Sequence, residues 1–152
     1  MNLTDFIRPD SIKVPLQATE KRGAINELVD ALAAAGRITD ATTLKDAVWT
    51  REQTRTTGIG NNLAIPHGKC AGIPALVMAI GKPASPMDFQ SIDRQPVKLI
   101  ILLASPPDRG QDHITVLAKI SKMFLVKDLR EQFFASESAE ELFALIKAQE
   151  PA

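Results

Sequence analysis

Apolar positions in the first third of the chain recur at the spacing of helix faces. Thr19 can cap a helix and Gly36 can end one, and the apolar residues between them lie three and four positions apart. These residues are Ile25, Leu28, Val29 and Leu32. Asp40 is the next candidate N-cap, and the helical pattern after it dissolves at residues 56–58. The pattern predicts two successive helices after a short strand at residues 12–16.

The spacing of apolar positions changes after residue 60. Residues 63–66 have a short extended pattern, and residues 75–80 and 97–103 are near-continuous apolar runs, typical of strands buried on both faces. Helical spacing then returns, with a short helix predicted at residues 129–134 and a last helix that begins with a capping-box pattern at Ser138. The predicted buried faces are Ile114, Leu117, Ile120, Met123 and Phe124, and then Leu142, Leu145 and Ile146.

Helices before, between and after the strands predict an α/β fold. We expect a single domain over residues 1–152, with a central mixed β-sheet flanked by helices on both faces. A chain of 152 residues fits one domain, and no repeat, charge block or low-complexity tract marks a linker. A core of this size requires no disulfide or structural metal.

Charge and composition exclude several classes of protein. Lys plus Arg and Asp plus Glu number 18 each, so the net charge supplies no positive field for nucleic acid. Cys70 is the only cysteine, which excludes an intrachain disulfide and is compatible with a reducing compartment. No signal-peptide run opens the chain, and no segment approaches the ~20 apolar residues of a membrane span. We expect a cytoplasmic protein that binds no nucleic acid and spans no membrane.

The candidate chemistry centres on the two histidines, His67 and His113. With an unperturbed pKa of about 6.5, a histidine has a neutral, nucleophilic nitrogen at cellular pH. Pro66 fixes the backbone before His67 and Gly68 removes bulk after it, a combination that suits a ring presented at a strand end.

The segment upstream of His67 has two interpretations. Its glycines and asparagines, at residues 58–62, can turn backbone N–H groups toward an anion as a nest does, with Lys69 and the pair Arg51 and Arg55 adding positive charge from one face of a helix's last turn. Alternatively, residues 58–62 are merely a turn and His67 is a partly buried loop histidine. Local composition does not decide between the two.

Metal and dinucleotide sites fit the sequence poorly. His67 and Cys70 have a His-x-x-Cys spacing, but two histidines and one cysteine cannot fill a metal site without carboxylates from elsewhere. The glycine run at residues 58–63 lacks its last glycine and leads out of a helix rather than into one, against a dinucleotide fingerprint. We expect no metal and no cofactor.

The spacing around His67 matches a known signature. The matching pattern is Glu52, then six residues, Ile59-Gly60, two residues, and residues 63–68. It resembles the phosphorylation site of the fructose/mannitol-type IIA domains of the bacterial phosphoenolpyruvate-dependent phosphotransferase system. The resemblance extends through residues 50–52, residues 92–97 and His113. Residues 51–53 and 56–60, with the one-domain length, are most similar to the nitrogen-related group of these domains.

The resemblance implies that His67 is phosphorylated on Nε2 by a small HPr-like phosphocarrier protein, with Nδ1–H held by a backbone carbonyl. Arg51 matches the arginine beside the phosphohistidine, and His113 matches the second histidine, a donor to a phosphoryl oxygen. Two plainer alternatives remain open. His113 can sit in a helix N-terminal turn capped by Asp108 or Asp112, and Arg51 can be a surface partner of Glu52 or Asp46.

The other residues near the signature carry weaker predictions. Arg55 and Lys69 are secondary candidates, whereas Trp49 and Cys70 are expected to be packing residues. Such a domain works either in a relay that passes phosphate to a cysteine or histidine of a IIB domain for sugar uptake, or as a regulator of partners such as potassium transporters or sensor kinases. The lack of a fused transporter domain favours nitrogen- or potassium-related regulation.

Overall fold

A computed structural model describes residues 2–150. Within them, strands form one mixed sheet in the order β1-β5-β6-β3-β2, and β4 pairs with β6 beyond β3. β5 and β6 are antiparallel, whereas β1 runs parallel to β5, and β3 and β4 run parallel to β6. The strands are β1 (Ile12–Leu16), β2 (Gly58–Gly60), β3 (Leu63–Ala64), β4 (His67–Lys69), β5 (Val77–Pro83) and β6 (Leu99–Ser105).

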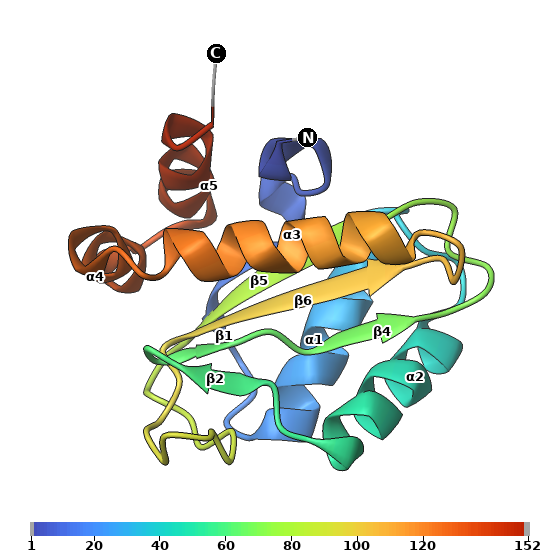
Figure 1. The fold of residues 1–152 in the computed structure, drawn as a ribbon, viewed down its shortest axis with the longest axis horizontal. Helices are drawn as coiled ribbons and strands as arrows, with labels where there is room; N and C mark the ends of the chain where they lie inside the picture. The colour runs from blue at the N-terminus through green and yellow to red at the C-terminus, as the bar shows by residue number, and fades with distance from the viewer. Residues whose placement is uncertain (1, 151–152) are drawn as a thin grey trace.

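Helices cover both faces of this sheet, as predicted. Figure 1 shows α1 and α2 on one side and α3 on the other, with α4, α5 and the N-terminal 3-10 turns at the end of the second layer. The helices are α1 (Lys21–Ala34), α2 (Ala41–Thr54), α3 (Gly110–Met123), α4 (Lys127–Ala135) and α5 (Ala139–Ala148), and the turns are Leu3–Asp5 and Pro9–Ser11. Within residues 2–150, no helix combines the length and the apolarity needed to cross a bilayer.

Two hydrophobic cores lie on opposite sides of β5 and β6. Ile100 and Leu102 pack with the apolar faces of α1 and α2, whereas Ile101 and Leu103 pack with α3, α4 and α5. Successive strand residues point to opposite faces, so a strand covered on both sides needs apolar residues at every position. This requirement explains the near-continuous apolar runs in the sequence.

The helix starts follow the predicted caps, with one difference at α1 and one at α5. Asp40 accepts a hydrogen bond from the Thr43 amide, as predicted, but Glu20 rather than Thr19 caps α1, because its carboxylate reaches the amides of residues 22 and 23. Ser138 caps α5 through the Glu141 amide as predicted, but the Glu141 carboxylate accepts from the Glu137 amide rather than from the Ser138 amide that a capping box requires. Carboxylates favour such positions because the helix N-terminus carries partial positive charge.

The predicted buried face of α3 is wrong only in the first turn. Ile120 and Phe124 are buried as predicted, and Leu117 and Met123 are partly buried against the same core. Ile114 is 60% exposed, and the buried residues are His113, Val116 and Ile120. The sequence pattern counted apolar residues only, so it missed that the inward-facing position of the first turn is a histidine. In α5, Leu142 and Ile146 are buried as predicted, whereas Leu145 is only partly buried.

Candidate functional site

His67 opens β4 at a point where the chain has just left β3. Both strands pair with β6, β3 at Leu99 and Ile100 and β4 at Leu103, so residues 65–66 bridge two short parallel ladders. The Nδ1 of His67 lies 2.9 Å from the Ile65 carbonyl oxygen. A carbonyl can only accept, so Nδ1 donates its proton and Nε2 keeps a free lone pair. The backbone hydrogen bond implied by the resemblance is present.

His113 lies against His67 from the first turn of α3. The ring centroids are 5.1 Å apart with the planes inclined at 66°. His113 is only 3% exposed, and its Nδ1 lies 2.7 Å from the Ser105 hydroxyl at the end of β6. Its Nε2 is buried and has no hydrogen-bond partner among residues 2–150. The structure thus brings the two histidines of the chain into one site.

Arg51 extends from the last turn of α2, and its Nη1 donates to the carbonyl oxygen of Arg55 at 2.9 Å. Arg55 itself is the C-cap, with an extended backbone (φ −164°, ψ 136°), so the predicted shared helix face of the two arginines is wrong. The alternative in which Arg51 pairs with Glu52 at the surface is also wrong, because Glu52 is buried and pairs with Lys21.

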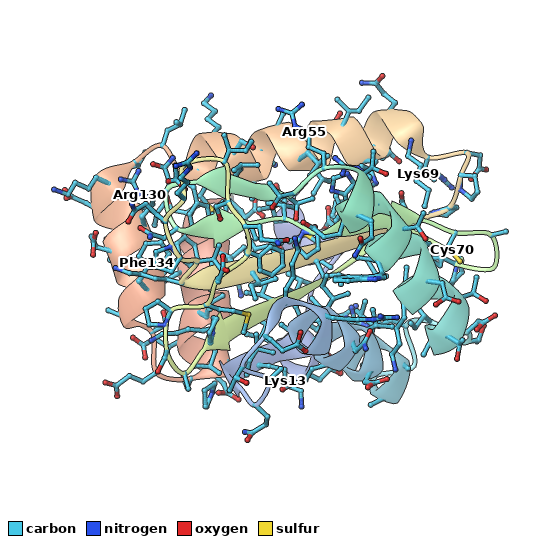
Figure 2. All side chains as sticks on the ribbon, turned by 90° about the horizontal axis from the view of Figure 1, so that it is seen from below. Lys13, Arg55, Lys69, Cys70, Arg130 and Phe134 are labelled. Carbon is cyan, nitrogen blue, oxygen red and sulfur yellow. The ribbon has the colours of Figure 1, made fainter. Side chains whose placement is uncertain are left out.

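Two further cations approach the site from its rim. The Nζ of Lys69, at the end of β4, lies beside Gly110 at the start of α3, where an added Cβ would be 3.4 Å away. The exposed side chain of Arg55 lines a groove with Leu117 of α3. Figure 2 shows Lys69 and Arg55 beside α3 at different points along it.

The N-terminus of α3 contributes partial positive charge near Lys69. The helix begins at Gly110 with Arg109 as N-cap, and no side chain caps it. The alternative in which Asp108 or Asp112 caps this helix is therefore wrong, and Asp112 instead lies 3.7 Å from the Arg109 guanidinium. An uncapped helix N-terminus leaves amide donors and the positive end of the helix dipole available.

Both histidines are held neutral by their surroundings. Burial, together with smaller effects of the nearby His67 and Lys69, lowers the pKa of His113 to about 4. The pKa of His67 is also lowered, mainly by burial and in part by the charge of Arg51, while its hydrogen bond to Ile65 opposes the shift. At neutral pH both rings are therefore uncharged, which leaves the Nε2 of His67 nucleophilic.

Grooves flank His67 on both sides. The larger, with a volume of about 820 Å³, lies between α2 and α3, and the smaller, of about 260 Å³, lies toward β2. Arg51, His67 and Leu117 line both of them. The exposed Ile114 lines the larger groove, and the exposed Ile59 and Ile92 line the smaller. The site is thus open to a large partner.

The predicted anion nest at residues 58–62 is wrong, and the plain turn is correct. Asn61 and Asn62 have φ values of 57° and 61° and close a hairpin between β2 and β3. The carbonyl of Asn62 accepts from the amide of Lys98, just before β6, whereas His67 pairs with Leu103 near the end of that strand. The turn and the histidine therefore lie at different ends of the strand.

Glu52 and Ser105 are site-supporting residues that the sequence did not identify as such. Glu52 is 3% exposed, forms a 2.9 Å ion pair with Lys21, and accepts hydrogen bonds from the amide and hydroxyl of Thr57. It thereby ties the end of α2 to the strand that leads to the site. Glu52 was visible as a fixed position of the signature, but nothing marked it as buried, and nothing marked Ser105.

Cys70 and Trp49 pack in the core beneath the site. Cys70 is buried in the core shared with α1 and α2, and Trp49 is partly buried against the same core, so both are packing residues as predicted. In the part of the chain that the structure describes, no three His, Cys, Asp or Glu side chains gather as a metal site would require.

Residues 5–149 match the protein family described as the phosphoenolpyruvate-dependent sugar phosphotransferase system, EIIA 2. The chain belongs to this EIIA family. It is 31% identical over 148 residues to a nitrogen regulatory protein of Bradyrhizobium diazoefficiens, covering 96% of this chain and 95% of that protein. It is 33% identical over 141 residues to a fructose-specific EIIA component of Haloferax volcanii, covering 91% and 92%. The resemblance identified from the sequence is confirmed.

EIIA domains also occur within longer proteins. The chain is 30% identical over 146 residues to a fructose-specific EIIABC component of Bacillus subtilis, but it spans only 23% of that protein's length. Among solved structures, the nitrogen regulatory protein IIA-Ntr of Neisseria meningitidis superposes with a TM-score of 0.86 at 27% identity, covering 93% of this chain and 97% of that one. IIA mannitol of Escherichia coli shares the fold, with a TM-score of 0.79 at 19% identity and coverage of 92% and 98%.

Proposed function

We propose that this EIIA-family chain is a phosphohistidine phosphocarrier, in which the Nε2 of His67 accepts a phosphoryl group from an HPr-like protein charged by phosphoenolpyruvate. The observation that carries the proposal is the fixed ring of His67. Its Nδ1 donates to the Ile65 carbonyl, so Nε2 holds the lone pair, and His67 lines two open grooves.

The transfer needs positioning and positive charge rather than covalent help from the protein. As the new bond forms between phosphorus and the Nε2 of His67, the donor's nitrogen–phosphorus bond breaks and its electron pair returns to the donor imidazole. No proton leaves His67, because Nε2 is unprotonated at the start. Arg51 supplies charge to the phosphoryl oxygens, and His113 supplies a hydrogen-bond donor.

The main role proposed is regulation of cytoplasmic and membrane-associated partners through protein contacts. The likeness to nitrogen regulatory proteins over nearly the full length of both chains supports this role. A phosphoryl group adds a charge of about −1.5 to −2 beside the grooves of a chain with zero formal net charge. Partners such as potassium transporters or sensor kinases would then distinguish the two forms.

The second candidate is a sugar-specific IIA component that passes the phosphoryl group to a IIB domain. The similarity to a free-standing fructose-specific EIIA component supports it. IIA mannitol of Escherichia coli, which has the same fold as this chain at 18% identity, has been solved in complex with phosphorylated IIB mannitol. In this role the phosphoryl group would leave His67 for a cysteine or histidine of the acceptor domain.

Phosphorylation is tested by incubating the protein with phosphoenolpyruvate and the two upstream phosphotransfer proteins. Intact-mass measurement should show one acid-labile phosphate on the wild type and none on His67→Ala. The proposal is wrong if the wild type gains no phosphate, or if His67→Ala gains it equally.

A second step separates the two candidate roles. The phosphorylated protein is mixed with a purified fructose-type IIB domain, and in parallel the two forms are used to retain partners. Rapid loss of phosphate to the IIB domain, with identical partners for the two forms, favours the sugar role. Stable phosphate and different partners favour regulation.

A further inference from the structure

The Ser105 hydroxyl contacts the second histidine, His113, at its Nδ1. Ser105 is the last residue of β6 and is fully buried, and its backbone is paired with Lys69 of β4, with its carbonyl accepting from the Cys70 amide. Its hydroxyl lies 2.7 Å from the Nδ1 of His113. Two pieces of regular structure, β6 and α3, therefore fix this contact.

The direction of this hydrogen bond follows from the partners available. A hydroxyl can donate to an imidazole nitrogen or accept from it. If Nδ1 carried the proton, the Ser105 hydroxyl would be a buried donor without an acceptor, since no other partner for it is found among residues 2–150. If Ser105 donates to Nδ1, the hydroxyl proton is satisfied. Each arrangement leaves one buried donor without a partner among residues 2–150, the Ser105 hydroxyl in the first and the Nε2–H of His113 in the second. Only in the second would a phosphoryl oxygen on His67 satisfy that donor, so the second arrangement is expected of a site built to hold a phosphoryl group.

The direction of this hydrogen bond determines whether the other nitrogen of the His113 ring, Nε2, carries a proton. A neutral imidazole has one proton, so an accepting Nδ1 places that proton on Nε2. This Nε2 is buried without a partner in the described part of the chain and belongs to a ring in edge-to-face contact with His67. A phosphoryl group on His67 would bring acceptor oxygens to the same place.

We propose that Ser105 is a positioning residue that fixes neutral His113 in its Nε2–H form, so that this N–H is ready to donate to the phosphoryl group on His67. The inference rests on the proposed function, because the phosphoryl oxygens are the acceptors that the Nε2–H would meet. The opposite form would present a lone pair to an anionic oxygen and repel it.

The first experiment measures the proton position directly. Nitrogen-15 NMR of the imidazole groups in the unphosphorylated protein should show His113 as Nε2–H in the wild type and in Ser105→Thr, which keeps the hydroxyl. In Ser105→Ala neither ring nitrogen has a partner, so exchange between both forms is expected. An Nδ1–H form in the wild type, or an unchanged spectrum in Ser105→Ala, overturns the inference.

The second experiment measures phosphate uptake by the same variants from the HPr-like donor. Ser105→Ala should weaken the hydrogen bond from His113 to the charged phosphoryl group, so it should slow uptake roughly 10- to 100-fold. Ser105→Thr should restore the rate. Ser91→Ala is the matched control, since Ser91 is also buried but its hydroxyl has no partner among residues 2–150. Equal rates for Ser105→Ala and the wild type overturn the inference.

The two experiments separate two failures. If the wild type takes up no phosphate, the proposed function fails, while the NMR measurement still decides the role of Ser105 in holding the His113 proton. If the wild type takes up phosphate but His113 is Nδ1–H, only the inference about Ser105 fails. Far-UV circular dichroism of each variant shows whether it has folded.

Discussion

The rings of His67 and His113 meet edge to face, with centroids 5.1 Å apart and planes inclined at 66°. They come from different layers of the fold, His67 from β4 in the sheet and His113 from α3 above it. Each ring has its Nδ1 held by a neighbour, the Ile65 carbonyl or the Ser105 hydroxyl. The second nitrogen of each ring, Nε2, is thereby left for chemistry at the site.

The burial of His113 predicts that the fold loses stability in mild acid. Its pKa is about 4 in the folded protein and 6.5 when exposed, so the unfolded chain binds the extra proton between these values. The free energy of unfolding should therefore fall as the pH drops from about 6.5 to about 4, by about 3 kcal/mol from this residue. Urea unfolding at pH 7.5 and pH 4.5 measures the loss.

His113→Gln is the comparison for this measurement, because glutamine stays neutral across the range. The wild type should lose more stability than His113→Gln between the two pH values. Carboxylates and His67 titrate in both proteins, so the difference between the two isolates His113. Equal losses would show that His113 does not resist protonation.

Arg51 and Arg55 give a matched pair of arginines at one helix end. Arg51 lines both grooves beside His67, whereas Arg55 contributes its carbonyl to Arg51 and has an exposed side chain. Arg51→Ala should slow phosphate uptake about 100-fold, as loss of a charge-stabilising donor does. Arg55→Ala keeps the carbonyl, so its rate should stay within a few-fold of the wild type.

Rates of phosphate transfer from the HPr-like donor, measured by rapid quench, decide this prediction. Arg51→Lys retains the charge without the planar fork of donors and should fall between Arg51→Ala and the wild type. If Arg51→Ala and Arg55→Ala slowed transfer equally, a general loss of positive charge at the rim of the site would account for both. Arg51 would then have no specific role in phosphate transfer.

The ion pair of Lys21 and Glu52 predicts a large cost for breaking it. The Glu52 side chain is 1% exposed and that of Lys21 is 12% exposed, so Lys21→Ala leaves a buried carboxylate without its cation. The expected loss in the free energy of unfolding is about 3 kcal/mol. Lys45→Ala removes a lysine from a pair with Asp30 of similar length, 2.8 Å, in which the aspartate is 61% exposed. The loss there should be below about 1 kcal/mol.

Chemical denaturation of both lysine variants at pH 7 tests this difference. Similar losses for Lys21→Ala and Lys45→Ala would mean that burial of Glu52 does not set the energy of its pair.

Gly68 sets the distance between β4 and α2. A Cβ at this position would lie 3.1 Å from the backbone nitrogen of Val48 and 3.0 Å from its Cγ2. Gly68→Ala must therefore push α2 outward, at a cost of about 1–3 kcal/mol, and α2 carries Arg51 toward the site. Stability and the rate of phosphate uptake should both fall.

Gly110→Ala is the control for this substitution. The nearest atom to its added Cβ is the flexible end of Lys69, at 3.4 Å, so this variant should keep wild-type stability. Thermal unfolding and phosphate uptake of the two alanine variants provide the comparison. A Gly68→Ala protein as stable and as fast as Gly110→Ala would contradict the close approach of α2.

Local patterns predicted the elements better than the contacts between them. β1 and the Asp40 cap of α2 follow from residues that lie next to each other, where propensity and short hydrogen bonds act. Only the first turn of the buried face of α3 was misplaced, because its inward position is a histidine, which hydropathy counts as polar. The anion nest was misplaced because glycine and asparagine serve a hairpin equally well.

The candidate site was predicted from a signature rather than from physics. Composition left His67 as one of two histidines, and the matched spacing singled it out together with Arg51 and His113. The roles of Lys21 and Ser105 depend on which distant segments pack together, α1 against the end of α2 and β6 against α3. One-dimensional spacing carries no information on such contacts, so these residues required the structure.

The most direct test of the account is phosphorus–nitrogen correlation NMR of the phosphorylated, nitrogen-15-labelled protein. The account predicts a single phosphorus signal coupled to the Nε2 of His67, with Nδ1 still protonated against the Ile65 carbonyl. A phosphoryl group on Nδ1 of His67, on His113, or on no histidine would contradict it.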